Sequence, residues 1–206
     1  MINRVVYIFV FSVFFSCVNS SPSIKELPVY GHKEFLEGVD ADTIFHTIPP
    51  WSFVNQFGKA ISSDAYNGKI YVVDFFFSHC PTICPAMTMN LVKLQQLSSD
   101  LDIELISFTV DPKKDSPERL LWYQDAFGIN GENWNLLTGN QQSIYELGVN
   151  GFLVPNQEDA LAPGGFLHSE QIMLVDKMGR IRGYYDGTDE DQVPLLYNDI
   201  LALKQE

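Results

Sequence analysis

The chain is organised around the stretch Ile70-Tyr71-Val72-Val73-Asp74-Phe75-Phe76-Phe77-Ser78-His79-Cys80-Pro81-Thr82-Ile83-Cys84-Pro85. Its first half is rich in β-branched and aromatic residues, which is typical of a buried strand. Beyond it, apolar residues recur at helical spacing as far as Leu97. Pro85 suits the first turn of a helix, where its missing N–H leaves no bond unmade, and it biases Cys84 away from α geometry. The sequence therefore predicts a strand-to-helix junction, with Cys84 at the helix boundary and Cys80 in the loop before it.

This position gives the two cysteines a defined chemistry. A thiol near a helix N-terminus is stabilised as thiolate by the helix dipole and by unpaired N–H groups. Cys80 and Cys84 are close enough along the chain to form a disulfide or to hold one soft metal ion. A purely structural disulfide is the simpler alternative. Open α/β sheets place their functional sites at the carboxyl ends of strands, which favours a functional role for the two cysteines over a purely structural one.

Length and composition limit the classes of protein that fit. The 206 residues allow one domain with an N-terminal extension, and 46% hydrophobic and 13% aromatic residues can fill a sizeable core. The net charge is −13, from 26 acidic and 13 basic residues. This balance argues against nucleic-acid binding, which needs a basic surface. Such acidity serves solubility, or contact with basic partners and metal cations.

The N-terminus has the pattern of an export signal. One positive charge in residues 1–4 precedes the apolar residues 5–15, a run that is too short to cross a bilayer. It ends in Phe14-Phe15-Ser16-Cys17, which resembles a bacterial lipobox, although phenylalanine replaces the usual leucine three residues before the cysteine. We therefore expect residues 1–16 to be a lipoprotein-type signal peptide and Cys17 to be lipidated. An ordinary signal peptide that is cleaved nearby is the alternative.

The lipobox would account for the odd number of cysteines. Cys17 would carry the lipid anchor, and Cys80 and Cys84 would form the functional pair. Residues 17–45 then form a tether and lead-in, and residues 46–206 form the folded domain. The expected location is the bacterial cell envelope, with the domain held at the membrane on the periplasmic or extracytoplasmic side.

Strand and helix patterns alternate along the domain. We expect strands at 49–57, 70–77, 103–110, 134–138, 171–175 and 180–185, helices at 84–98, 117–127, 141–147 and from a cap at Thr188 to about 204, and a long loop at 155–167. Ser116 and Gly128 fit the cap and stop of the second helix, and Thr188 with Asp191 resembles a capping box for the last. The pattern indicates an α/β fold with a mixed sheet flanked by helices. A dithiol at the first strand-to-helix junction narrows this to a thioredoxin-like domain.

Four separated motifs lie in a fixed order between Trp51 and Gly187. They are Cys80-Pro81-Thr82-Ile83-Cys84-Pro85, Val110-Asp111-Pro112-Lys113-Lys114-Asp115-Ser116-Pro117-Glu118, Trp134-Asn135-Leu136-Leu137-Thr138-Gly139, and His168 followed by Ile172-Met173-Leu174-Val175-Asp176-Lys177-Met178-Gly179. Together they resemble the Sco/SenC family of copper proteins, which assist cytochrome c oxidase assembly. Thr82 replaces the family's usual aspartate and Ser78 its usual threonine, and neither position is a ligand in that pattern.

The resemblance implies that Cys80, Cys84 and His168 bind one copper, as Cu(I), Cu(II) or both. It further implies a copper metallochaperone whose partners are the copper-bearing subunit of a terminal oxidase and an upstream copper donor or thiol reductant. Thiolates select Cu(I), and imidazole also suits Cu(II). Asp111 is a candidate for orienting or tuning the site from a neighbouring strand. A role as a structural turn-former is an equal alternative for Asp111.

Other functions stay open at this point. A membrane-anchored thiol-disulfide oxidoreductase would use Cys80 and Cys84 as a redox pair to reduce the cysteines of the oxidase subunit. Thioredoxin-type enzymes, however, have two residues between their cysteines and a proline just before the hairpin strand, which residues 168–171 lack. A peroxiredoxin would have threonine where Phe77 stands. Two cysteines and a histidine would also suit zinc. His79 is expected to point away from the thiols.

Overall fold

A seven-stranded mixed sheet forms the centre of the computed structural model, which describes residues 26–35 and 43–206. The strand order is β11-β10-β5-β6-β7-β3-β4. The strands are β3 (Ser52–Asn55), β4 (Ala60–Ser62), β5 (Ile70–Phe76), β6 (Ile103–Thr109), β7 (Trp134–Thr138), β10 (Gln171–Val175) and β11 (Ile181–Asp186). The central strands β5, β6 and β7 are parallel, and the outer strands pair antiparallel to their neighbours.

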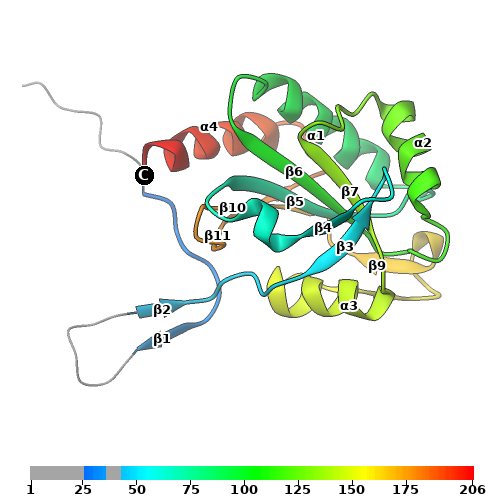
Figure 1. Cartoon of the computed structure of the whole chain (residues 1–206), viewed down its shortest axis with the longest axis horizontal. Coiled ribbons are helices and arrows are strands. Elements are labelled where there is room, and N and C mark those ends of the chain that lie inside the picture. The colour runs from blue at the N-terminus through cyan, green and yellow to red at the C-terminus, as the bar shows by residue number, and fades with distance from the viewer. Residues whose placement is uncertain (1–25, 36–42) are drawn as a thin grey trace, which may run out of the picture.

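Helices cover both faces of this sheet, as the sequence predicted (Figure 1). The helices α1 (Cys84–Leu97), α2 (Pro117–Phe127) and α4 (Gln192–Gln205) lie on one face, and α3 (Gln141–Glu146) lies on the other. Because α1 and α2 are successive crossovers between parallel strands, the right-handed rule puts them on the same side. α3 does not stop at Gly148 as expected; it continues as a π-helical turn, Leu147–Gly151.

Both ends of α2 follow their predicted signals, whereas the start of α4 does not. The Ser116 side chain accepts the N–H of Arg119 at 3.3 Å, and Gly128 ends α2 with φ 66°, a conformation that suits a residue without Cβ. The predicted capping box at Thr188 is wrong. Its hydroxyl donates to Asp186 at 2.7 Å within a turn, and α4 begins later, at Gln192.

Aromatic rings fill the core on the α3 side of the sheet. Phe108, which is fully buried on β6, is in ring contact with four other aromatic side chains: Trp51, Phe53, Phe75 and Phe152. On the opposite side, Val193, Leu196, Ile200 and Leu203 of α4 are buried as their spacing predicted. β5 is buried along its whole length, so the loop that follows it is attached to a rigid strand.

Part of the predicted long loop is a small β-hairpin. Its strands are β8 (Asn156–Glu158) and β9 (Phe166–His168), joined by a segment that contains the short 3-10 turn η3 (Pro163–Gly165). This hairpin forms a two-stranded sheet separate from the central one. Strands of three residues are too short to show an alternation of polar and apolar side chains, which explains why the sequence did not reveal them.

The described lead-in packs on the domain edge. The Tyr30 N–H donates to the carbonyl of Ile181 at 2.9 Å, and Leu27 is buried. Strands β1 (Lys33–Phe35) and β2 (Thr43–Phe45) then form an outer hairpin, and the 3-10 turn η1 (Ser63–Tyr66) follows β4. Cys17 and the signal segment lie outside the described residues, so the domain limits and the lipidation site stay predictions.

A buried arginine fastens this lead-in. Arg182, 3% exposed, donates to the carbonyls of Leu27 at 2.7 Å and Pro28 at 3.0 Å. The same guanidinium pairs with Asp176 at 3.0 Å and with Glu206 at 2.7 Å. Arg182 therefore joins the start of the described chain, the β10–β11 turn and the end of α4.

Two features bear on where a function can lie. No helix within 26–35 and 43–206 is long and apolar enough to cross a membrane.

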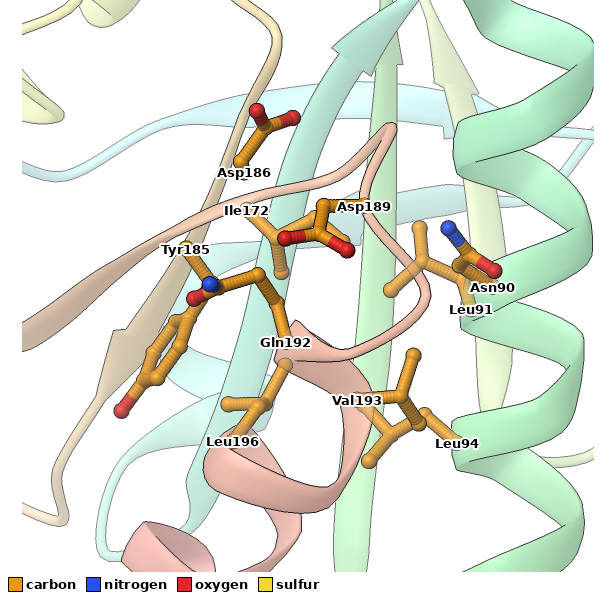
Figure 2. A pocket seen from close by; sticks show the side chains of 10 residues that line it. All are labelled: Asn90, Leu91, Leu94, Ile172, Tyr185, Asp186, Asp189, Gln192, Val193 and Leu196. Carbon is orange, nitrogen blue, oxygen red and sulfur yellow. The ribbon is translucent and has the colours of Figure 1, made fainter.

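A cavity of about 10 Å³ lies between α1 and α4, bordered by apolar residues and by Asp186 and Asp189 (Figure 2). Because one water molecule needs at least about 10–15 Å³, this gap is a packing defect rather than a ligand site.

Candidate metal centre

The two cysteines and His168 meet at the carboxyl end of β5. Cys84 is the first residue of α1, Cys80 lies in the loop between β5 and α1, and His168 is the last residue of β9. Their ligand atoms all lie within 4.8 Å of one another. Cys84 is 1% exposed, and Cys80 and His168 are each 9% exposed. The structure therefore brings the three predicted ligands together in one cluster that is almost fully buried from solvent.

Hydrogen bonds orient the imidazole toward the sulfurs. His168 Nδ1 lies 3.0 Å from the carbonyl oxygen of Ser169, which can only accept, so Nδ1 carries the proton. Nε2 then has a free lone pair, and it lies 3.3 Å from Cys84 Sγ. The ring also packs edge-on against the buried ring of Phe77, with centroids 5.6 Å apart. This tautomer presents Nε2 as a metal ligand without rearrangement.

The two thiols share one proton between them. A hydrogen bond from the Cys84 thiol lowers the pKa of Cys80 to about 3 against the effect of burial, and the backbone N–H groups of Cys84 and Thr82 act in the same direction. The same hydrogen bond and burial raise the pKa of Cys84. Cys80 is therefore the thiolate of the pair. Cys84 keeps its proton until a metal ion binds its sulfur or an oxidant converts the pair to a disulfide. Cys80 and Cys84 do not form a disulfide in this structure.

A buried carboxyl group lies in the sheet that supports the cluster. Asp74 on β5 is 2% exposed and accepts a hydrogen bond from the Ser107 hydroxyl, which in turn accepts the indole N–H of Trp134 at 2.8 Å. Burial raises the pKa of Asp74 to about 6. The hydrogen bond from Ser107 and the electrostatic interaction with His168 lower this pKa but do not offset the effect of burial. The raised pKa means that the fold favours the neutral acid at this position.

We expect Asp74→Asn to stabilise the protein above about pH 6 by up to about 3 kcal/mol, the equivalent of two pKa units. Because the folded pKa is raised to about 6, the wild-type fold binds more protons than the unfolded chain and loses stability as the pH rises toward that value. Asparagine still accepts from Ser107 and carries no charge. Urea unfolding at several pH values measures the effect, with the exposed Asp125→Asn as control. An unchanged pH slope in Asp74→Asn would contradict it.

The loop before Cys80 is held by a second buried carboxylate, Asp115. Its Oδ2 accepts the backbone N–H of Ser78 at 3.0 Å and its Oδ1 accepts the Ser78 hydroxyl at 2.6 Å. The hydroxyl of Thr109 also donates to Asp115, whose side chain is fully buried. Arg119 approaches the same serine from α2, with Nε 2.8 Å from the hydroxyl oxygen. This network fixes Ser78 from three sides.

Asp111 lies outside the ligand cluster and has contacts of both predicted kinds. Its backbone carbonyl accepts from the N–H groups of Lys114 and Asp115 at 3.1 and 3.0 Å, as a turn-former does. Its carboxylate lies 3.0 Å from His79 Nε2 and 3.4 Å from Lys114 Nζ. His79 is therefore directed toward Asp111, in line with its expected absence from the ligand set. The carboxylate of Asp111 is thus linked to the loop of Cys80 through His79, and its backbone carbonyl is linked to that loop through Asp115.

Sequence reasoning missed Asp115, although it lies in a motif that had been singled out. The motif marked a loop at a strand end, but a buried aspartate and an exposed one look alike in a sequence. The nearest signal was position. Asp115 follows a strand that is parallel to β5 and ends at the same sheet edge, so it could have been expected near the cysteines.

The comparisons with known proteins agree with these observations. The sequence model of the SCO1/SenC family matches residues 40–201. The SCO1 protein homolog of Bacillus subtilis is 32% identical over 168 residues, which cover 78% of this chain and 82% of that protein. A SCO1/SenC family lipoprotein from Bacillus anthracis superposes with a TM-score of 0.72 at 31% identity, over 77% of this chain and 95% of that one.

Two further solved structures share the fold. BsSco, a member of the Sco family of cytochrome c oxidase assembly proteins in which a disulfide switch was identified, superposes with a TM-score of 0.68 at 29% identity, over 78% of this chain and 95% of its own. Yeast Sco1 with copper bound superposes with a TM-score of 0.58 at 25% identity, over 73% of this chain and 87% of its own. The predicted thioredoxin-like fold is confirmed. Since the matched range 40–201 includes both cysteines and His168, the chain belongs to the SCO1/SenC family.

Proposed function

We propose that the protein binds one copper ion through Cys80, Cys84 and His168 and delivers it to the copper site of a terminal oxidase. The observation that carries the proposal is the cluster itself, with three ligand atoms within 4.8 Å of one another. One thiolate and one free imidazole nitrogen are already in place, and the second thiol lies between them. The copper-bound state of yeast Sco1 supports copper as the metal.

The donor set suits a cargo that must be released again. Two sulfurs and one imidazole favour Cu(I) and also hold Cu(II). Three protein ligands leave the metal open to attack by the ligands of a partner. Loading removes the proton of Cys84, so copper binding depends on pH and on the thiols being reduced. Delivery to an oxidase subunit is supported by the role of BsSco in cytochrome c oxidase assembly.

We further propose that Cys17 is lipidated and holds the domain at a membrane of the cell envelope, on its periplasmic or extracytoplasmic side. The support is the lipobox-like Phe14-Phe15-Ser16-Cys17 and the lipoprotein character of the B. anthracis relative. Metabolic labelling with a palmitate analogue tests this proposal. We expect label on the wild type and none on Cys17→Ala, and label on both would contradict it.

A second function, thiol-disulfide exchange with the cysteines of the oxidase subunit, is favoured by one observation. The pKa of Cys80 is lowered to about 3, which makes it a thiolate beside a second thiol, as an attacking and a resolving cysteine require. The disulfide switch in BsSco is consistent with such chemistry. Both functions use the same two sulfurs, and oxidation to the disulfide would remove the metal site.

An anaerobic copper titration of the reduced domain, residues 20–206, separates the two functions. We expect one tight equivalent of Cu(I), and none for the disulfide form. Cu(II) should give a coloured thiolate charge-transfer band, which zinc cannot give. Failure to bind copper tightly, together with rapid exchange with a disulfide peptide, would contradict the copper proposal and favour the oxidoreductase.

A further inference from the structure

We infer that Asp115 is a positioning residue that places Cys80 opposite Cys84 by holding the Phe77-Ser78 peptide. This inference goes beyond the three ligands and concerns the same site, so its copper readout rests on the proposed function. The evidence is a set of hydrogen bonds that leads from a fully buried carboxylate to the backbone of Cys80.

The first step is the attachment of Ser78. Asp115 accepts its backbone N–H at 3.0 Å and its hydroxyl at 2.6 Å, so one carboxylate fixes both the main chain and the side chain of one residue. Thr109, at the end of β6, donates to the same carboxylate. Asp115 is thereby tied to a strand of the sheet, and Ser78 is held against the end of β6 rather than free in its loop.

The second step leads from Ser78 to the sulfurs. Phe77, the preceding residue, donates its backbone N–H to Cys84 Sγ, and its carbonyl accepts the backbone N–H of Cys80 at 3.2 Å. One residue therefore touches Cys84 at its amide nitrogen and Cys80 at its carbonyl. The Phe77 carbonyl and the Ser78 N–H share one peptide plane, so the hydrogen bond from Ser78 to Asp115 also fixes the carbonyl that holds the Cys80 backbone. Fixing Ser78 therefore holds Cys80 in place opposite Cys84, which begins α1.

Arg119 completes the attachment from the solvent side. It donates to the Ser78 hydroxyl at 2.8 Å and to the Ser78 carbonyl at 3.4 Å, and its guanidinium lies 4.0 Å from the ring centroid of Trp122. These contacts hold the outer side of the segment, whereas Asp115 holds its inner side. Because the inner contacts are buried and charged, they are the stronger ones.

The test compares Asp115→Ala with Asp115→Asn. Alanine removes all three accepted hydrogen bonds, whereas the asparagine oxygen can still accept from Ser78 N–H and Thr109. We expect alanine to weaken Cu(I) binding by about 10–100-fold, the range found when partners of metal ligands are removed, and asparagine to restore most of it. The equilibrium of the Cys80–Cys84 disulfide with glutathione should shift toward the dithiol by about tenfold in alanine, since a loosened loop lowers the effective concentration of one sulfur at the other.

A destabilised variant remote from the site serves as control. Arg182→Met should lower stability at the far end of the sheet and leave both readouts at wild-type values. If Asp115→Ala does not fold, Ser78→Ala replaces it and Ser78→Thr, which keeps the hydroxyl, is its control. Wild-type copper affinity and a wild-type glutathione equilibrium in the folded Asp115→Ala or Ser78→Ala variant would overturn the inference.

The two readouts also separate this inference from the proposed function. If the wild type binds no copper tightly, the copper proposal fails, but the glutathione equilibrium still reports how Asp115 places the sulfurs. If the wild type binds copper and Asp115→Ala binds it equally well with an unchanged disulfide equilibrium, only the positioning role fails.

Discussion

His168→Ala is expected to weaken Cu(I) binding by more than about 100-fold, because loss of a direct ligand exceeds the 10–100-fold effect of losing a partner of a ligand. Cys80→Ala and Cys84→Ala should each lose at least as much, since two sulfurs form most of a soft-metal site. Competition with a chromogenic Cu(I) chelator measures all three affinities. Circular dichroism should show the same fold in each variant.

His79→Ala is the matched control for this experiment. His79 is the immediate neighbour of Cys80, but its ring is directed to Asp111 at 3.0 Å rather than into the cluster. Because no ligand atom of the cluster is among the contacts of His79, we expect the affinity of this variant for Cu(I) to stay within about tenfold of the wild type, below the effect of losing a partner of a ligand. Wild-type affinity in His168→Ala, or a larger loss in His79→Ala, would show that the histidine ligand has been wrongly assigned.

Arg182→Met is expected to lower the free energy of unfolding by about 3–5 kcal/mol, the usual effect of removing one partner from a buried ion pair. The change leaves the carbonyls of Leu27 and Pro28 without their donor, and it leaves Glu206 with only the Leu27 N–H at 3.5 Å. Asp176 keeps Arg180, at 2.7 Å, so the loss falls mainly on the lead-in and the end of α4. Urea unfolding measures the stability, and limited proteolysis should show faster cleavage before Tyr30.

Lys93→Met provides the comparison with an exposed ion pair. Lys93 pairs with Glu190 at 2.7 Å, but the side chains are 47% and 72% exposed. Solvent screening reduces such a pair to about 0–1 kcal/mol. If Arg182→Met destabilised the protein no more than Lys93→Met, the role of Arg182 in fastening the lead-in would have to be abandoned.

The sequence was sufficient for the parts of the fold that have strong local signals. The buried run before Phe77 predicted β5, and Ser116 and Gly128 predicted the limits of α2, because each of these effects is decided within a few residues. The predicted cap at Thr188 was wrong because a local signal alone could not show a competing neighbour. A threonine followed by an acid three residues later fits a capping box, but Asp186 lay close enough to bind its hydroxyl instead.

The three clustered side chains of the candidate site were predicted, but their support was not. The resemblance to the Sco/SenC family pointed to Cys80, Cys84 and His168, whereas spacing alone indicated only a dithiol. The burial of Asp74 and Asp115 depends on tertiary packing between strands and helices far apart in the sequence. No local pattern encodes that a carboxylate will lie against Ser78 rather than in water.

The docked lead-in has a consequence for the geometry of encounter. It joins the domain at Ile181, at the sheet end where β5 begins, whereas the sulfurs lie beyond the end of β5, roughly 20 Å away for a strand of seven residues (Figure 1). With a lipid on Cys17, the roughly ten residues up to Leu27 reach at most about 35 Å. The copper-binding pole would then face away from the bilayer. If the protein delivers copper as proposed, the receiving protein should present its ligands on a domain that stands clear of the lipid surface. Lengthening the tether should then change the rate of encounter more than the fit of the two proteins.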